Sequence, residues 1–113
     1  MAIERALVVR KPWIDLILNG QKSWEMRSRS TSVRGQIGLI EQGSGLIVGE
    51  CCLDGVGESI KNFNIGYGYQ LHKIGDLELL DKWHVPWVLS GARRYEKPVP
   101  YKHPKGAVVW VRV

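Results

Sequence analysis

Cysteine and histidine are scarce in this sequence, and their spacing argues against two kinds of site. The two cysteines, Cys51 and Cys52, are adjacent. On a strand they would point to opposite faces, and no second pair is present to build a disulfide framework or a zinc site. The three histidines, at positions 72, 84 and 103, lack metal-ligand spacing. The sequence therefore gives no reason to expect a metal ion or another cofactor.

Long apolar runs and phosphate-binding loops are also missing. No apolar stretch approaches the roughly 20 residues of a membrane span, and the N-terminal run MAIERALVVR carries charges where a signal peptide would be apolar. We therefore expect a cytoplasmic protein with no membrane contact. The GYG run at 66–68 is too short for a phosphate loop, and no Ser-His-Asp arrangement can be argued.

Glycine is abundant and charge is polarised. Thirteen glycines among 113 residues exceed the roughly 7% average and indicate many tight turns, while the length suits one domain, residues 1–113. The net charge is +5, with basic residues in excess over 1–34 and 91–106 and acidic residues in excess over 35–90. This polarity favours an anionic partner, most simply nucleic acid, although a surface charged for solubility would show the same counts.

The beginning of the chain predicts a strand, a helix and a second strand, over residues 6–10, 13–19 and 23–27. The first is a β-branched run. Pro12 stands where proline opens a helix, apolar residues follow at helical spacing, and Gly20 provides the stop. The period then changes to two, which places Glu25 and Arg27 on one face of the second strand.

The rest of the chain predicts further short strands, at 36–41, 46–53, 87–89 and 107–113. The glycine-bracketed turn 43–45 joins the first two as a hairpin. Residues 60–75 predict a structured loop with a brief helical turn, Asp76 caps a short helix up to Trp83, and 91–106 is a basic, proline-punctuated segment. This pattern predicts an α+β, mostly β protein: a small β-barrel of five or six strands with one or two short helices.

The helix and the strand after it resemble a known signature. In the run KPW…ILNGQKSWEMRS, Lys11-Pro12-Trp13 precedes an apolar helix, and Gly20, Lys22, Glu25 and Arg27 follow it. This spacing resembles the pattern of ASCH domains, which are named for homology to an activating signal cointegrator. The strand LIVGECCL and the closing GAVVWVRV are also similar to the family, so the resemblance spans nearly the whole chain.

The resemblance implies a PUA-like β-barrel with a cleft beside the signature helix that is proposed to bind RNA. Some bacterial relatives are amidohydrolases acting on N4-acetylcytidine, which use a lysine and a threonine. Lys22 matches that lysine, and Glu25 stands at the threonine position. Other relatives have been regarded as ribonucleases, so the resemblance leaves binding and hydrolysis both open.

The charged residues after the helix allow three interpretations. Lys22 lies at the turn, and Glu25 and Arg27 project from one strand face, so an ammonium and a carboxylate could meet in a cleft. Burial there would tune either group for general acid–base work, with Lys22 and Glu25 as the catalytic pair. A binding role for the same groups is the second interpretation, and an ion pair that holds the helix–strand turn is the third.

Further candidates for RNA binding lie at the helix start and in the basic C-terminal part of the chain. Lys11 lies beside the helix start, where free N–H groups favour phosphate, and Trp13 and Trp87 are expected to shape the walls of the cleft. A surface of cations and rings typical of single-strand binding is predicted for Arg93, Arg94 and Tyr95. Core packing of the two tryptophans and a solvated connection are the alternatives.

The sequence thus predicts an RNA-binding protein that holds single-stranded RNA or a modified nucleoside in a basic cleft. The alternative is a hydrolase acting on RNA or a modified nucleoside, either a ribonuclease or similar to the N4-acetylcytidine amidohydrolases. A protein-interaction module is a third class, and the polarised charge argues mildly against it.

Overall fold

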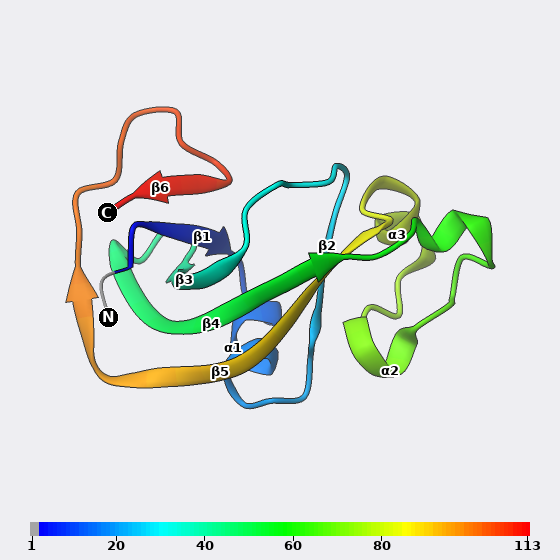
Figure 1. Cartoon of the computed structure of the whole chain (residues 1–113), viewed down its shortest axis with the longest axis horizontal. Coiled ribbons are helices and arrows are strands. Elements are labelled where there is room, and N and C mark those ends of the chain that lie inside the picture. The colour runs from blue at the N-terminus through cyan, green and yellow to red at the C-terminus, as the bar shows by residue number, and fades with distance from the viewer. Residues whose placement is uncertain (1–2) are drawn as a thin grey trace.

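The computed structural model describes residues 3–113 as six strands with short helices between them (Figure 1). The strands are β1 (Arg5–Val9), β2 (Trp24–Arg27), β3 (Gly35–Glu41), β4 (Leu46–Val56), β5 (Val85–Pro100) and β6 (Trp110–Arg112). The α-helices are α1 (Trp13–Leu18), α2 (Tyr69–His72) and α3 (Leu77–Lys82), and a 3-10 turn spans Ile60–Asn62. The predicted helices and strands are all present, and α2 is the brief helical turn expected within residues 60–75.

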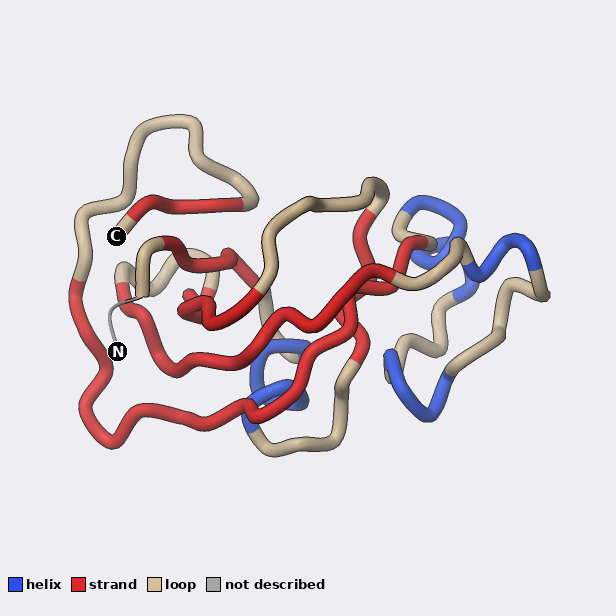
Figure 2. The backbone as a smooth tube through the Cα atoms, in the orientation of Figure 1, coloured by secondary structure: helices blue, strands red, loops and turns tan. Residues whose placement is uncertain are grey.

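The strands form one sheet in the order β2-β5-β4-β3-β1-β6. Neighbouring strands are antiparallel except β1 and β3, which are parallel. The sheet curls into a half-barrel, visible in the tube of Figure 2. The predicted mostly β, barrel-like fold is therefore confirmed, with β2 and β6 as the two edges of the curled sheet.

The β3–β4 hairpin depends on two glycines. Gly43 and Gly45 have φ angles of +81° and +72°, in the left-handed region that side chains rarely enter. A tight connection can therefore reverse the chain between the two strands. The hairpin predicted from 36–41 and 46–53 is confirmed, with β4 continuing to Val56.

Helix α1 packs against the sheet with its apolar face, which contributes Ile14, Ile17 and Leu18 to the main core. Gly49 on β4 lies at the closest approach. A Cβ atom at that position would be 2.5 Å from Leu18 Cδ2 and would overlap the carbonyl oxygen of Arg93. The missing side chain thus lets α1 approach the sheet, and this fixes where the helix presents its first residue, Trp13.

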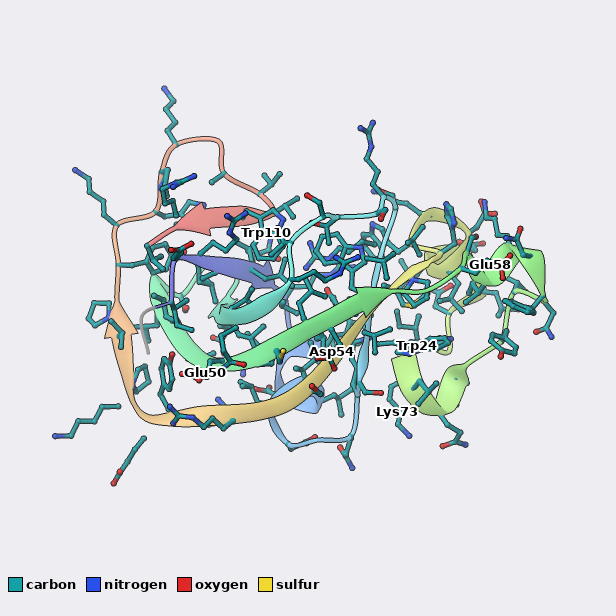
Figure 3. The ribbon with its side chains drawn as sticks, viewed as in Figure 1. Trp24, Glu50, Asp54, Glu58, Lys73 and Trp110 are labelled. Atoms are coloured by element: carbon teal, nitrogen blue, oxygen red, sulfur yellow. The ribbon has the colours of Figure 1, made fainter. Side chains whose placement is uncertain are left out.

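Residues 57–84, here called the helical excursion, leave the sheet between β4 and β5 and lie to one side of it (Figure 1). Their apolar residues form a second small core with β2, made of Met26, Ile60, Ile74 and Leu80. Asp76 caps α3 as predicted, because its side chain accepts a hydrogen bond from the Glu78 N–H at 2.9 Å. Trp24 of β2 points toward α2 (Figure 3).

Strand β5 is longer than the sequence predicts. The segment 91–106 was expected to connect strands, yet β5 runs to Pro100 and pairs with β4 as far as Leu46. Beyond Leu89 the strand has a neighbour on one side only, since β2 pairs with Val85–Val88. Prolines are tolerated at such an edge because no partner needs their missing N–H.

The last strand is correspondingly shorter than predicted. Residues 107–113 were expected to be extended throughout, but β6 covers Trp110–Arg112. It pairs with β1 at the edge of the sheet, opposite Arg5–Leu7.

Replacing Gly49 tests the close packing of α1 on the sheet. Gly49→Ala should lower the free energy of unfolding by about 1–3 kcal/mol, because the new methyl group overlaps backbone and a buried leucine. Gly55→Ala on the same strand is the matched control, since a Cβ at that position meets nothing within 4 Å. Urea unfolding of both variants measures the difference, and equal stabilities would contradict the packing argument.

Candidate functional site

A pocket of about 200 Å³ opens where β1, β2 and α1 meet the helical excursion. Its polar groups are two guanidinium groups, one carboxylate and one amide, and its walls include two indoles. The lining residues are Val8, Arg10, Trp13, Glu25, Met26, Arg27, Gln42, Ile74, Trp83 and Val108. We call this the arginine pocket. It lies beside the signature helix and contains the predicted site residues Trp13, Glu25 and Arg27.

Strand β2 presents Glu25 and Arg27 to the pocket on one face, as the period of two predicts. Arg27 Nε and Nη2 lie 3.0 and 2.8 Å from Glu25 Oε2, and Nη2 also donates to the Val8 carbonyl oxygen at 2.7 Å. The guanidinium carbon lies 5.6 Å from the ring centroid of Trp87. Among residues 3–113 no acceptor faces Arg27 Nη1, so a ligand in the pocket can use those two donors.

Lys22 lies beneath the pocket. Its side chain is 0% exposed, and its Nζ donates to the carbonyl oxygens of Trp24 at 2.6 Å and His72 at 2.7 Å. Glu25 Oε1 is 3.7 Å away, so two carbonyl oxygens accept hydrogen bonds from the ammonium and a carboxylate compensates its charge. Burial lowers the pKa of Lys22 to about 8, against the opposing effect of the Glu25 carboxylate. The predicted Lys22–Glu25 pair is present, and its enclosure fits a structural cross-link better than an accessible acid or base.

Arg10, at the end of β1, is a site residue that the sequence analysis missed. Its guanidinium carbon lies 4.9 Å from the ring centroids of both Trp13 and Trp83, whose planes meet at 79°. Two such cation–π contacts hold the group at the pocket. Within residues 3–113 its side chain has neither a carboxylate nor a hydrogen-bond partner. Its position directly before Lys11 was the one available signal.

Trp87 is not at the pocket surface. It is 3% exposed, its ring stacks on Trp110 at a centroid distance of 5.8 Å, and its Nε1 donates to the Arg29 carbonyl oxygen at 2.8 Å. The hydrogen-bonded indole therefore fills the core, the alternative stated for it above. Trp87 does not line the pocket, but its ring packs against the guanidinium group of Arg27, which does.

Lys11 and Arg94 lie outside the pocket, on the solvent side of α1. Lys11 Nζ lies 3.3 Å from Asp15 Oδ2 and 3.6 Å from Glu41 Oε1, and Arg94 Nη2 donates to Asp15 Oδ1 at 2.9 Å. The hydrogen bond from Arg94 is the main cause of a lowered pKa at Asp15, and Lys11 adds to it. Two cations thus share one carboxylate next to the pocket.

Arg93 and Tyr95 form a separate cluster around Glu50, which projects from β4 far from the helical excursion (Figure 3). Arg93 Nη2 and the Tyr95 hydroxyl group donate to Glu50 Oε1 at 3.2 and 2.9 Å, and Gln36 donates to Oε2 at 2.8 Å. The structure therefore divides the predicted RNA-binding residues between the pocket, the outer side of α1, this cluster and, for Trp87, the core.

Potential metal ligands and a buried cysteine are also present among the described residues. Between residues 3 and 113, His, Cys, Asp and Glu side chains form no group of three or more that could hold a metal ion. Burial raises the pKa of the Cys51 thiol to about 12, so this cysteine is a core residue with little nucleophilic character. In the same range of residues, no helix is long and apolar enough to cross a membrane.

Removing the buried ammonium should destabilise the protein strongly. Lys22→Met leaves two carbonyl oxygens without their donor and removes one of the two cations paired with Glu25, and breaking a buried ion pair in this way costs about 3–5 kcal/mol. Lys11→Met is the matched control, because that lysine is exposed and its ion pairs are screened by water. Guanidinium unfolding at pH 7 compares the two variants. Similar stabilities would show that Lys22 is not a structural cross-link.

The lowered pKa of Lys22 predicts that the stability of the protein depends on pH, and the same variant tests this. The pKa of Lys22 falls from 10.5 in the unfolded chain to about 8 in the folded one. Between these values the unfolded chain binds a proton that the folded chain does not, so stability rises with pH. The free energy of unfolding of the wild type, minus that of Lys22→Met, should therefore increase from pH 8 to pH 10.5. A constant or falling difference would contradict the burial of a charged amine.

Comparison with known proteins places the chain in a family. The ASCH domain family model matches residues 7–99. The solved structure of ASCH from Zymomonas mobilis superposes with a TM-score of 0.71 at 12% identity, covering 97% of this chain and 87% of that one.

Solved structures of two mutants of the Zymomonas mobilis protein superpose on this chain equally well. Its serine-to-alanine mutant has a TM-score of 0.72 at 12% identity, with 97% and 87% of the two chains covered. Its tyrosine-to-phenylalanine mutant also has a TM-score of 0.72 at 12% identity, with 99% and 91% covered. No curated protein matches the sequence. The likeness at this identity establishes the fold, and the family match establishes that the chain belongs to the ASCH domain family, whose members are generally RNA-binding domains of PUA-like fold.

Proposed function

We propose that this protein binds single-stranded RNA and holds one nucleotide, or one modified nucleoside, in the arginine pocket. The observation that carries the proposal is the charge of the pocket. Arg10 and Arg27 line the pocket and Lys22 lies beneath it, and Glu25 is the single carboxylate among the lining residues. The excess positive charge attracts phosphate, and counterion release adds an affinity that does not depend on sequence.

The pocket groups suit different parts of a nucleotide. Arg10 is held in place by two indoles and has free donors for a phosphate group. Glu25 Oε1 has only a 3.7 Å contact to Lys22, so it can accept a hydrogen bond from an amino group on a base edge. Planar guanidinium groups also stack on bases. Phosphate contacts would supply affinity, and the carboxylate would supply selectivity.

Two of the predicted residues outside the pocket extend this surface. Lys11 and Arg94 flank Asp15 on α1, which also carries Trp13 of the pocket wall. A strand that leaves the pocket past α1 would meet these two cations. Arg93 and Tyr95 adjoin Arg94 in β5 but contact Glu50, on the opposite face of the strand, where they would form a separate binding surface. Cations interleaved with a ring are typical of surfaces that bind single strands.

Hydrolysis of RNA or of a modified nucleoside has less support. Its predicted catalytic pair is Lys22 and Glu25, yet the Lys22 ammonium is fully enclosed and donates to two carbonyl oxygens. Glu25 Oε2 is bound by Arg27. A general acid or base must reach the proton that it transfers, and Lys22 does not reach the pocket space.

Arg10 offers the sharpest test of RNA binding. In fluorescence anisotropy with a labelled single-stranded RNA, Arg10→Met should weaken binding about tenfold, the order expected for loss of a charge-assisted contact. It should also reduce the slope of log K against log salt by about 0.7, the value for one phosphate of a single strand. The side chain is exposed, so the fold is retained.

Arg112→Met is the matched control, because it removes one exposed arginine that does not line the pocket. Equal losses in the two variants would show that net charge, and not the pocket, determines binding. If the wild type does not bind RNA at all, the proposed function is wrong. Gel analysis of the same mixtures over time reports hydrolysis, and cleavage by the wild type would overturn the preference for a binding module.

A further inference from the structure

The size of the arginine pocket limits what it can hold. Its volume of about 200 Å³ lies below the roughly 300–1,000 Å³ of pockets that take drug-sized ligands. A single group at the end of a molecule fits such a space more readily than an uninterrupted polynucleotide strand. The proposed RNA ligand would therefore enter with one of its ends.

The charge of the pocket also favours the end of an RNA strand over its interior. Glu25 is paired with both Lys22 and Arg27, and Arg10 has no carboxylate partner among residues 3–113. Two positive charges are thus left without a counter-charge. A phosphodiester inside a strand carries one negative charge, whereas a phosphomonoester at a strand end carries about 1.5 to 2 at pH 7.

The donors are placed for a group with several free oxygens. Ring contacts with Trp13 and Trp83 orient Arg10, and its N–H groups donate to no acceptor among residues 3–113. In the same range of residues, Arg27 Nη1 also has no acceptor. Guanidinium groups bind phosphate oxygens in bidentate pairs. A terminal phosphate offers three oxygens that are not ester-linked, and an internal phosphodiester offers two.

From these observations we infer that the arginine pocket recognises a nucleotide through its terminal phosphomonoester, either at an end of an RNA strand or on a free mononucleotide. This inference rests on the proposed function and specifies the ligand of the same site. Arg10 is the main phosphate contact, Arg27 Nη1 is the second donor, and Lys22 contributes charge from beneath.

Competition binding tests the inference. Unlabelled RNA oligonucleotides of one sequence, with a 5′-phosphate, a 3′-phosphate or hydroxyl groups at both ends, compete with an internally labelled RNA in the anisotropy assay. One of the phosphorylated forms should bind about tenfold more tightly than the hydroxyl form. Arg10→Met should remove this preference, Arg10→Lys should retain only part of it because the fork geometry is lost, and Arg112→Met should leave it unchanged.

A second titration distinguishes a phosphate on a free mononucleotide from a phosphate at an RNA end. It gives a result even if RNA does not bind. Uridine 5′-monophosphate, uridine 3′-monophosphate, uridine and inorganic phosphate are each added while the fluorescence of the tryptophans, two of which line the pocket, is recorded. A monophosphate that binds at least tenfold more tightly than uridine, with the gain lost in Arg10→Met, supports the inference even if RNA does not bind.

One outcome would overturn the inference. If neither the phosphorylated RNA nor a monophosphate binds better than its hydroxyl counterpart, the pocket is not a phosphomonoester site. RNA that still binds, with equal affinity whatever its ends carry, would then leave the proposed RNA binding standing. Tight binding of a strand end with no response to a monophosphate assigns the phosphate to RNA alone and retains the inference.

Discussion

The buried ammonium of Lys22 is the interaction on which the rest of the site depends. Removing an ammonium from water costs several kcal/mol unless its hydrogens and charge are compensated. The compensation comes from separate parts of the chain: the Trp24 carbonyl and the Glu25 carboxylate on β2, and the His72 carbonyl in the helical excursion. One lysine can satisfy all three only if the excursion is held against β2, and this contact builds one wall of the pocket.

Lys22 also helps to position Arg27, because both pair with Glu25. Glu25 pairs with Lys22 through Oε1 at 3.7 Å, and its Oε2 accepts from Arg27. Arg27 is held further by the Val8 carbonyl oxygen on β1 and by the ring of Trp87 from the core. A guanidinium constrained in this way loses little side-chain entropy when a ligand binds, which is the energetic advantage of a preorganised site.

The sequence predicted the local elements and the signature side chains well because their information is local. The helix, its proline start and the alternation of β2 brought Trp13, Glu25 and Arg27 to the pocket. Arg10 was missed because its position depends on Trp83, a residue far along the chain. The burial of Lys22 was hidden because two of its acceptors are main-chain carbonyls, which have no sequence signal. The full length of β5 depended on whether its prolines face a neighbouring strand, and sequence alone does not give the pairing.

The two lysines of the signature illustrate why the family pattern is stronger evidence for geometry than for chemistry. Lys11 and Lys22 flank the same helix, but the first is exposed beside Asp15 and the second is enclosed. The enclosed lysine and its partners build the floor of the pocket, so the signature specifies a shape and a charge. Other lining residues, including Arg10 and Gln42, lie outside the signature. Differences at those positions would change the ligand while the floor is retained, which allows one scaffold to serve distinct nucleotide ligands.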